Sequence, residues 1–356
     1  MRLKSIKLEN YRNYENLDLS FDDAKNINLF IGDNAQGKTN FLEAITLLSL
    51  AKSFRTKQHT SLIQWEKDYT RIVGTATHAN NEISLEFFAS IAPVQKKNLR
   101  KDNADVSIKN FIGQLNIVLF HPEDLNMLYL SPSLRRKYLD TILSQTDPLY
   151  FDALIQYNRI VKQRNKALFL IDLGKSSAEE LDVWDQQLAE YGTYILKKRL
   201  KLVDFFNEVA EGNYNNVSQT KDKLGVSYNA TIEGDYLEVI KAQRKNDLRY
   251  AQTTKGIHRD DLVFNFNGHN ISEFGSRGEM RTLLIALKFT EIAYIEKQAG
   301  RKPILLLDDV FSELDKKRQQ FLMDAIQEFQ SFITTTHHDF SVDGSSVFEI
   351  ESGKLK

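Results

Sequence analysis

Cysteine is absent from the 356 residues of this chain, which excludes disulfide bonds and thiolate metal sites. This absence suits a reducing compartment, and we expect the protein to be cytoplasmic. No apolar run reaches transmembrane length, and the first residues alternate like a strand without the apolar core of a signal peptide, so we expect no membrane partner. The formal net charge is only −1, so binding to nucleic acid would need local basic patches.

What the sequence does contain is one strong motif at residues 32–39. It reads Gly-Asp-Asn-Ala-Gln-Gly-Lys-Thr and matches every fixed position of G-x-x-x-x-G-K-[ST]. Residues 27–31 before it are typical of a buried strand, and the apolar residues after it recur at helical spacing. Strand, glycine loop and helix together form a phosphate site, because backbone N–H groups and the helix N-terminus face the anion. The alternative, a chance glycine-rich turn, does not explain this context.

We therefore predict that the loop binds ATP. Its predicted nucleotide-binding residues are Gly32, Asp33, Asn34, Ala35, Gln36, Gly37, Lys38 and Thr39. Lys38 is expected to act in catalysis by reaching the β- and γ-phosphates, and Thr39 is expected to hold Mg²⁺.

A second strand should bring an acid to this Mg²⁺. Residues 304–307 are all apolar and lead into Asp308 and Asp309. Asp308 falls at the carboxyl end of the strand, where ligands bind in such sheets, so we predict it to be a metal ligand. Asp309 is predicted to orient or deprotonate the attacking water. His337, at the end of the next strand, is the third predicted catalytic residue and would hydrogen-bond the γ-phosphate.

The spacing of the two motifs predicts the domain organisation. About 270 residues separate them, far more than one βαβ unit needs. Residues 71–100 alternate like a small antiparallel sheet, and the pattern from 122 to about 211 is almost entirely helical, ending near residues 212–216. We predict an α/β fold: a P-loop ATPase head, with a mixed sheet, flanking helices and an antiparallel β subdomain, carrying an inserted, mainly helical arm. The predicted head comprises residues 1–121 and 251–356, and the arm residues 122–250.

A second anion-binding device begins a helix shortly before the metal strand. Ser276 and Gly278 offer a hydroxyl, free N–H groups and the positive end of a helix dipole. One nucleotide does not need two helix termini from opposite ends of one domain. A pair of subunits, each closing the other's site, uses both, so we predict that Ser276 and Gly278 bind the nucleotide held by a partner copy.

This arrangement resembles the ABC-type ATPases of the SMC group, and within that group the RecF family of bacterial recombinational repair. The resemblance is carried, in this order, by residues 8–12, 32–39, 53–56, 122–125 with 135–136, 256–261, 276–282, 305–315 and 334–337. It implies ATP-dependent homodimerisation, slow ATP hydrolysis, and binding to DNA at gaps or single-strand/double-strand junctions. It also implies partnership with RecR and RecO in loading recombinase.

Two segments depart from the family pattern. The signature usually reads Ser-x-Gly-Gln-x-Arg with a second glutamine at x, whereas Arg277 and Glu279 stand here instead. Leu130-Ser131-Pro132 replaces the usual Gly-Gly-Pro, so the conformation of this turn stays open.

One assignment stays open at the level of residues. Residues 10–14, Asn-Tyr-Arg-Asn-Tyr, could contact adenine or form a polar turn with a packing tyrosine. The basic residues at 96–101 are typical of a solvated hairpin. The expected DNA contacts are instead Arg55, Lys57, Arg135, Arg136 and the cluster at 197–201.

Other P-loop proteins fit the sequence less well. A transporter-type ABC subunit would hold its two phosphate motifs closer together and would not need the helical arm. Another SMC-like ATPase acting on DNA remains the nearer alternative.

Overall fold

The computed structural model describes residues 1–78, 81–337 and 340–356, and they divide into two compact units. Unit 1 comprises Met1–Asp124 and Glu291–Lys356, and unit 2 comprises Leu125–Thr290. Residues 251–290 thus group with the helical unit, although the sequence placed them in the head. The reason is strand pairing, because β10 (Asp261–Phe266) pairs with β9 (Leu224–Asn229) and returns the chain to unit 2.

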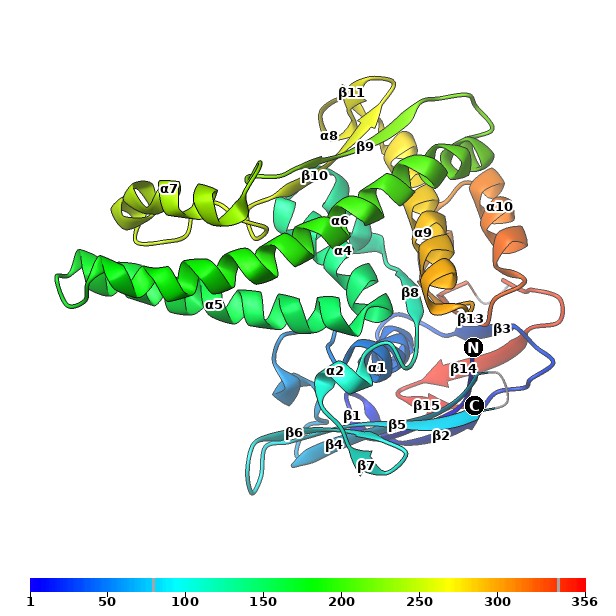
Figure 1. Cartoon of the computed structure of the whole chain (residues 1–356). Coiled ribbons are helices and arrows are strands. Elements are labelled where there is room, and N and C mark those ends of the chain that lie inside the picture. The colour runs from blue at the N-terminus through cyan, green and yellow to red at the C-terminus, as the bar shows by residue number, and fades with distance from the viewer. Residues whose placement is uncertain (79–80, 338–339) are drawn as a thin grey trace. The chain divides into compact units, whose positions relative to one another are not determined.

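A mixed, largely parallel sheet organises unit 1 (Figure 1). Its order is β15 (Lys354–Leu355), β14 (Ser346–Glu351), β3 (Ile27–Ile31), β13 (Ser331–Thr335), β12 (Ile304–Asp308) and β8 (Ile117–Phe120). The five strands from β14 to β8 are parallel, and every residue of β3, β12 and β13 is buried. The mainly apolar sequences of β3 and β12 are typical of strands covered on both faces. Parallel pairing brings the carboxyl ends of these strands to one edge of the sheet.

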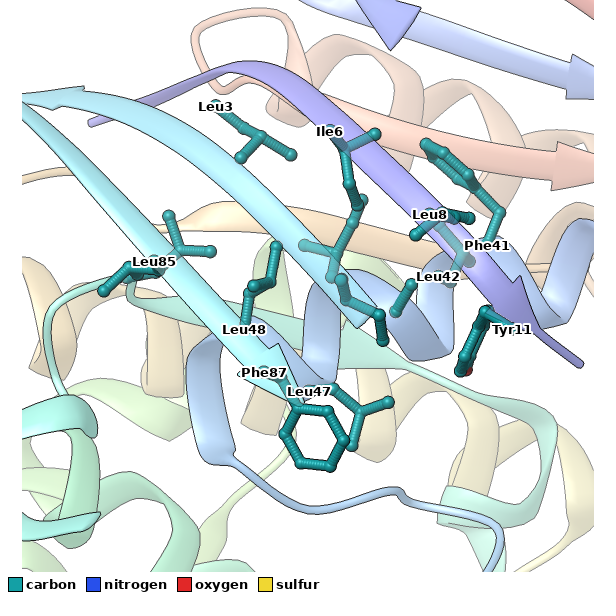
Figure 2. Packing of buried hydrophobic residues seen from close by; sticks show 14 of the residues in the cluster. Leu3, Ile6, Leu8, Tyr11, Phe41, Leu42, Leu47, Leu48, Leu85 and Phe87 are labelled. Carbon is teal, nitrogen blue, oxygen red and sulfur yellow. The ribbon is translucent and has the colours of Figure 1, made fainter. Parts of the chain in front are cut away.

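Helix α1 (Lys38–Leu50) follows β3 and joins this sheet to a second one. The second sheet is antiparallel, in the order β2 (Tyr14–Ser20), β1 (Arg2–Tyr11), β4 (Tyr69–His78), β5 (Asn81–Ser90), β6 (Lys96–Lys101) and β7 (Ala104–Asp105). Figure 2 shows Leu42, Leu47 and Leu48 of α1 packed with apolar side chains of β1 and β5. Phe30 of β3 stacks on Phe41 of α1, with 4.3 Å between ring centroids.

The remaining elements that lie wholly in unit 1 are short. They are η1 (His59–Leu62), α2 (Ile108–Phe111), η4 (Val310–Glu313) and α10 (Lys316–Ile326). The helix α9 (Arg277–Ala299) begins in unit 2 and ends in unit 1. The short η2 (Pro122–Leu125) stands where unit 1 passes into unit 2.

Unit 2 is mainly helical, as predicted for the inserted arm. Its elements are α3 (Asn126–Tyr129), α4 (Pro132–Thr146), α5 (Pro148–Asp172), η3 (Ala178–Glu180), α6 (Leu181–Ser218), α7 (Tyr236–Tyr250), α8 (Ile271–Phe274) and a sheet of β9, β10 and β11 (His269–Asn270). The predicted end of the helical block at residues 212–216 is wrong. Helix α6 continues to Ser218 because Ala210, Tyr214 and Val217 keep the buried stripe going.

The departure at residues 130–132 forms an ordinary helix start. Ser131 is the N-cap of α4, and its Oγ accepts the backbone N–H of Ser133 at 3.1 Å. Pro132 follows at the first helical position, where its missing N–H costs nothing. Within the described residues, no helix combines the length and apolar character needed to cross a bilayer.

Candidate nucleotide site

The phosphate loop of unit 1 connects β3 to α1, as the motif predicted. Gly37 precedes the helix with a φ of 117°, a left-handed conformation that a side chain would strain. A Cβ at Gly37 would also lie 2.6 Å from Asn13 Nδ2, and one at Gly32 would lie 2.3 Å from the carbonyl oxygen of Ile350. Both glycines are therefore required by close packing around the loop. Asp33, Asn34 and Ala35 form its exposed tip, and Gln36 is half-buried.

Neighbouring segments hold the loop from outside. Asn13 Nδ2 donates to the Gln36 carbonyl at 2.8 Å, and the Tyr14 hydroxyl donates to the Gly37 carbonyl at 3.0 Å. The N–H of Gly353, in the turn between β14 and β15, also donates to Gln36, at 3.0 Å. These contacts hold the backbone of the loop just before α1. No motif in β14 or β15 indicates that the turn between them contacts the phosphate loop.

Lys38 is buried, and its ammonium lies against the loop. The Nζ donates to the carbonyls of Gly32 and Asp33 at 2.6 and 2.7 Å. Burial lowers the pKa of Lys38, while the charges of Asp309, Asp308 and Asp33 act in the opposite direction. The backbone carbonyls are weak partners for a cation, so an anionic ligand in the loop can take this ammonium from them.

The predicted metal residues meet across the sheet. Thr39 Oγ1 donates to Asp308 Oδ1 at 2.9 Å, although the two are 269 residues apart. Thr334, at the end of β13, donates to the same oxygen at 2.8 Å, and His121 Nε2 lies 3.5 Å from Asp308 Oδ2. Sequence reasoning missed Thr334 and His121 as neighbours of Asp308. Both could have been found, because each lies at the carboxyl end of a strand beside β12.

Asp309 directly follows Asp308 at the end of β12. Its N–H donates to Thr334 Oγ1 at 3.0 Å, and its backbone has a φ of 49°. Its Oδ1 is buried and has no hydrogen-bond partner among the described residues. A buried carboxylate oxygen without a donor is costly unless a ligand or water supplies one. His337 lies at the end of β13, where its N–H donates to Thr335 Oγ1 at 3.1 Å and its side chain is exposed.

Both tyrosines of residues 10–14 are packing residues, so neither makes the contact with adenine that was one of the two interpretations of this segment. Tyr11 and Tyr14 are fully buried, so neither ring can stack on a base. Arg12 instead lines a pocket of about 680 Å³ that shares Asn13 with the phosphate loop. The lining comprises Arg12, Asn13, Glu15, Asn40, Arg55, Ser61, Ile63, Gln64, Trp65 and Lys67. Trp65, which is 92% exposed, is an aromatic residue that sequence reasoning did not single out.

The predicted signature residues lie in unit 2 at the start of α9. The N–H of Ser276 donates to Glu279 Oε2 at 2.7 Å, and the N–H of Glu279 donates to Ser276 Oγ at 3.3 Å. This reciprocal pair is a capping box, so Glu279 stabilises the start of α9 at the position where the family pattern has glutamine. The carbonyl of Gly278 accepts from Thr282 Oγ1 at 3.0 Å, within the same helix.

Part of the expected DNA-binding surface is not available. Arg135 is buried and forms a bidentate ion pair with Asp261 at 2.7 and 2.9 Å. Arg199 is 1% exposed and pairs with Asp140 at 2.8 Å. These two predicted contacts were wrong as surface residues, because their long-range partners cannot be read from the local charge run. Lys57, Lys197 and Lys201 are exposed.

Comparison with known proteins gives a consistent result over the whole chain. The model of the RecF/RecN/SMC N-terminal domain family matches residues 2–354. The DNA replication and repair protein RecF of Bacillus cytotoxicus is 40% identical over 356 residues, covering 97% of this chain and 93% of its own. RecF of Bacillus mycoides is 40% identical over 358 residues, with the same coverage of both chains.

Solved structures agree with the sequence comparison. The structure of the recombination mediator protein RecF with ATP superposes with a TM-score of 0.92 at 33% identity, covering 99% of this chain and 96% of that one. The Smc head domain of Pyrococcus furiosus gives a TM-score of 0.55 at 14% identity, covering 99% of this chain and 95% of that one, which shows a shared fold.

Proposed function

Because this chain belongs to the RecF family of DNA replication and repair ATPases, we propose that it is an ATP-switched DNA-binding protein of recombinational repair. ATP binding drives head-to-tail dimerisation on DNA at gaps or single-strand/double-strand junctions. Slow hydrolysis releases the dimer. RecR- and RecO-like proteins are the partners with which it helps to load recombinase.

One observation carries the proposal. Thr39 and Asp308, 269 residues apart, are in hydrogen-bond contact at 2.9 Å beside a buried lysine of the phosphate loop. The hydroxyl and the carboxylate are hard oxygen donors, which fit Mg²⁺ because this ion uses few protein ligands together with phosphate oxygens and water. When bound, Mg²⁺ would neutralise charge that develops on the phosphates.

The remaining residues of unit 1 have roles around that centre. Gly32 to Thr39 bind the phosphates through backbone N–H groups. The ammonium of Lys38 leaves the loop carbonyls and binds the γ-phosphate. Asp309 accepts a hydrogen bond from the attacking water through its unpartnered Oδ1. His337 contacts the γ-phosphate. The pocket lined by Arg12 and Trp65 takes the nucleoside, since it shares Asn13 with the loop.

The dimer uses the signature residues of a second copy. Ser276 and Gly278 bind the γ-phosphate held in the partner's loop, so ATP offers interface contacts that ADP lacks. A ligand shifts an equilibrium only by its differential affinity for the two states. Ser276→Arg should therefore bind ATP as a monomer but fail to dimerise or hydrolyse it. Light scattering with ATP, ADP and no nucleotide checks this, and equal masses of the parent protein in all three conditions would overturn the shared site.

The DNA-binding part of the proposal has its own experiment. Fluorescence anisotropy with gapped, duplex and single-stranded DNA, each with and without ATP, should show ATP-dependent binding that is tightest on gapped DNA. Phosphate contacts release counterions, so affinity should fall steeply as salt rises. ATP-independent binding, or a flat response to salt, would contradict the proposal.

A further inference from the structure

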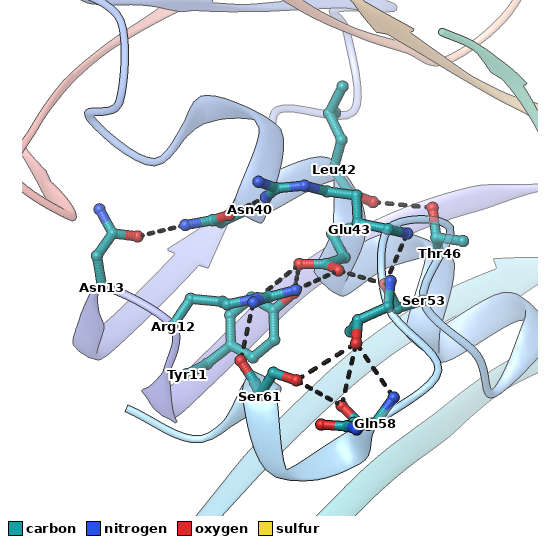
Figure 3. Close-up of polar contacts among 12 residues, drawn as sticks. Tyr11, Arg12, Asn13, Asn40, Leu42, Glu43, Thr46, Ser53, Gln58 and Ser61 are labelled. Carbon is teal, nitrogen blue, oxygen red and sulfur yellow. Dashed lines mark hydrogen bonds and ion pairs between the residues drawn. The ribbon is translucent and has the colours of Figure 1, made fainter. Parts of the chain in front are cut away.

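Glu43 is a buried carboxylate in the first turns of α1, on an otherwise apolar stretch of the helix. It is 0% exposed and accepts hydrogen bonds from three different side chains (Figure 3). The Tyr11 hydroxyl donates at 2.8 Å, Arg12 donates through Nε and Nη2 at 2.9 and 2.8 Å, and the Ser53 hydroxyl is in contact with the other oxygen. Burial would raise the pKa of Glu43, but the hydrogen bonds from Arg12 and Ser53 and the charge of Arg12 hold it below the usual value.

The partners of Glu43 lead to the wall of the pocket. Arg12 lines it, with 19% of its side chain exposed, and it is also tied to the carbonyl of Ser61 at 2.8 Å. Ser53 Oγ accepts the backbone N–H groups of Arg55 and Thr56, each at 2.9 Å, and so fixes the turn at residues 53–56. Arg55 then reaches Asn40 Oδ1 at 2.6 Å and lines the same pocket. One carboxylate thus orders both guanidinium groups of the pocket.

We infer that Glu43 is a positioning residue for nucleotide binding: it presents Arg12 directly, and Arg55 through Ser53, to the nucleoside end of the ligand. The inference rests on the proposed function, which assigns that pocket to the nucleoside. A buried charge is costly unless it is fully paired, and an apolar residue would serve the core of α1 at less cost. Packing of α1 alone therefore does not explain a carboxylate at this position.

Charge and positioning predict opposite effects of removing this carboxylate. A negative charge near an anionic nucleotide opposes binding, so its loss would tighten binding if electrostatics decided. If Glu43 positions the two arginines, its loss must weaken binding. Glu86 offers a matched control, because it is also a buried carboxylate of unit 1 and pairs with Arg71 at 2.7 Å and Arg100 at 3.8 Å. None of these three residues lines the pocket.

The experiment is calorimetric titration of the full-length protein with Mg²⁺–ADP, which carries the nucleoside and avoids hydrolysis. Glu43→Gln should weaken ADP binding by about tenfold or more, the scale of one lost charged hydrogen bond. Glu86→Gln should leave the affinity unchanged. In the double variant Arg12→Gln/Glu43→Gln the loss should be smaller than the product of the two single effects, because Glu43 acts partly through Arg12. Unchanged or tighter binding by Glu43→Gln would overturn the inference, and so would full multiplicativity.

A second variant covers the case in which Glu43→Gln does not fold, as judged by its thermal unfolding. Ser53→Ala keeps the Glu43–Arg12 pair and releases only the turn at residues 53–56. It should weaken ADP binding by about threefold, a fraction of the tenfold effect that one lost hydrogen bond can have. Binding equal to that of the parent protein would contradict the inference. Failure of the parent protein itself to bind ADP or ATP would instead overturn the proposed function, and the inference with it.

Discussion

Arg199 in unit 2 and Arg12 in unit 1 are both paired with a carboxylate, but they differ in what else surrounds the guanidinium. Arg199 is 1% exposed and surrounded by protein groups: Asp140, Tyr150 and Tyr228 side chains and the carbonyl of Ile257. Arg12 has 19% of its side chain exposed, on the wall of a pocket. The first arrangement satisfies a cation within the fold, and the second leaves part of a cation exposed in the pocket that we propose for the nucleoside.

The same contrast extends to the rest of each unit. In unit 2, Arg164 is bound by Asp185 and Asp247 at 2.6 and 2.7 Å, and all three are fully buried. In unit 1, Lys38 rests on two carbonyls and Asp309 keeps a buried oxygen without a donor in the described structure. Arg164 also keeps an Nη2 without a partner in the described structure, so a missing partner alone does not mark a ligand site. Pairing with two carboxylates indicates a structural role, whereas a cation held only by carbonyls of a phosphate loop can be taken by an anionic ligand.

Removing Arg199 should give the largest effect, on stability alone. Arg199→Met leaves Asp140 without its cationic partner, with only the Tyr150 hydroxyl among the described residues still donating to it, which should lower the free energy of unfolding by about 3–5 kcal/mol. The matched control is the neighbouring Lys198→Met, which breaks only a part-exposed pair with Asp147 and should cost about 1 kcal/mol or less. Urea unfolding measures both. Equal losses for the two variants would show that Arg199 is not a structural ion.

Asp309→Asn should separate binding from chemistry. It keeps Asp308 and the volume of the side chain but replaces the basic carboxylate that would act on water by a neutral amide, so ATP hydrolysis should fall by about 10²- to 10⁴-fold. Affinity for ATP should stay within a few-fold, and dimer should accumulate in light scattering with ATP. Turnover at the rate of the parent protein would make Asp309 a structural residue.

Lys38→Ala should weaken ATP binding by about 100-fold while leaving unfolding nearly unchanged. The lysine is bound only weakly by the carbonyls of Gly32 and Asp33, so little stability is lost, whereas the phosphates lose a charged partner. Calorimetric titration and thermal unfolding test the two halves. A large drop in stability with unchanged affinity would show that Lys38 has a structural role, like Arg199, and not the ligand-binding role proposed for Arg12.

A smaller effect is expected from pH on unit 2. Burial lowers the pKa of His258 to about 4, and the neutral ring is held between the Tyr157 hydroxyl at 2.9 Å and the Thr253 carbonyl at 3.1 Å. Because the unfolded chain binds the proton more readily, stability should fall as pH drops below about 6.5, by roughly 2 kcal/mol at pH 5. Urea unfolding from pH 8 to pH 5 checks this. A His258→Gln variant that kept the same slope would assign the effect to another group.

Local pattern alone determined much of the molecule. The phosphate loop lies within eight consecutive residues, so its strand, turn and helix follow from glycine positions and apolar spacing. Strand β3 has the predicted bounds, and β12 contains the predicted apolar run at residues 304–307, because such runs are typical of strands buried on both faces. The fold class and the family are confirmed for the same reason: the motifs keep their order over the whole chain.

Tertiary structure alone decided which side chains meet. Arg12 and Arg135 are both arginines in polar segments, yet one lines a pocket and the other is buried against Asp261. Trp65 and Glu43 carry no motif, and their surroundings come from strands and turns distant in sequence. Side-chain pairing is a long-range property, because it depends on how the topology brings segments together. Charge and polarity in the sequence state what a residue can do, and the fold selects what it does.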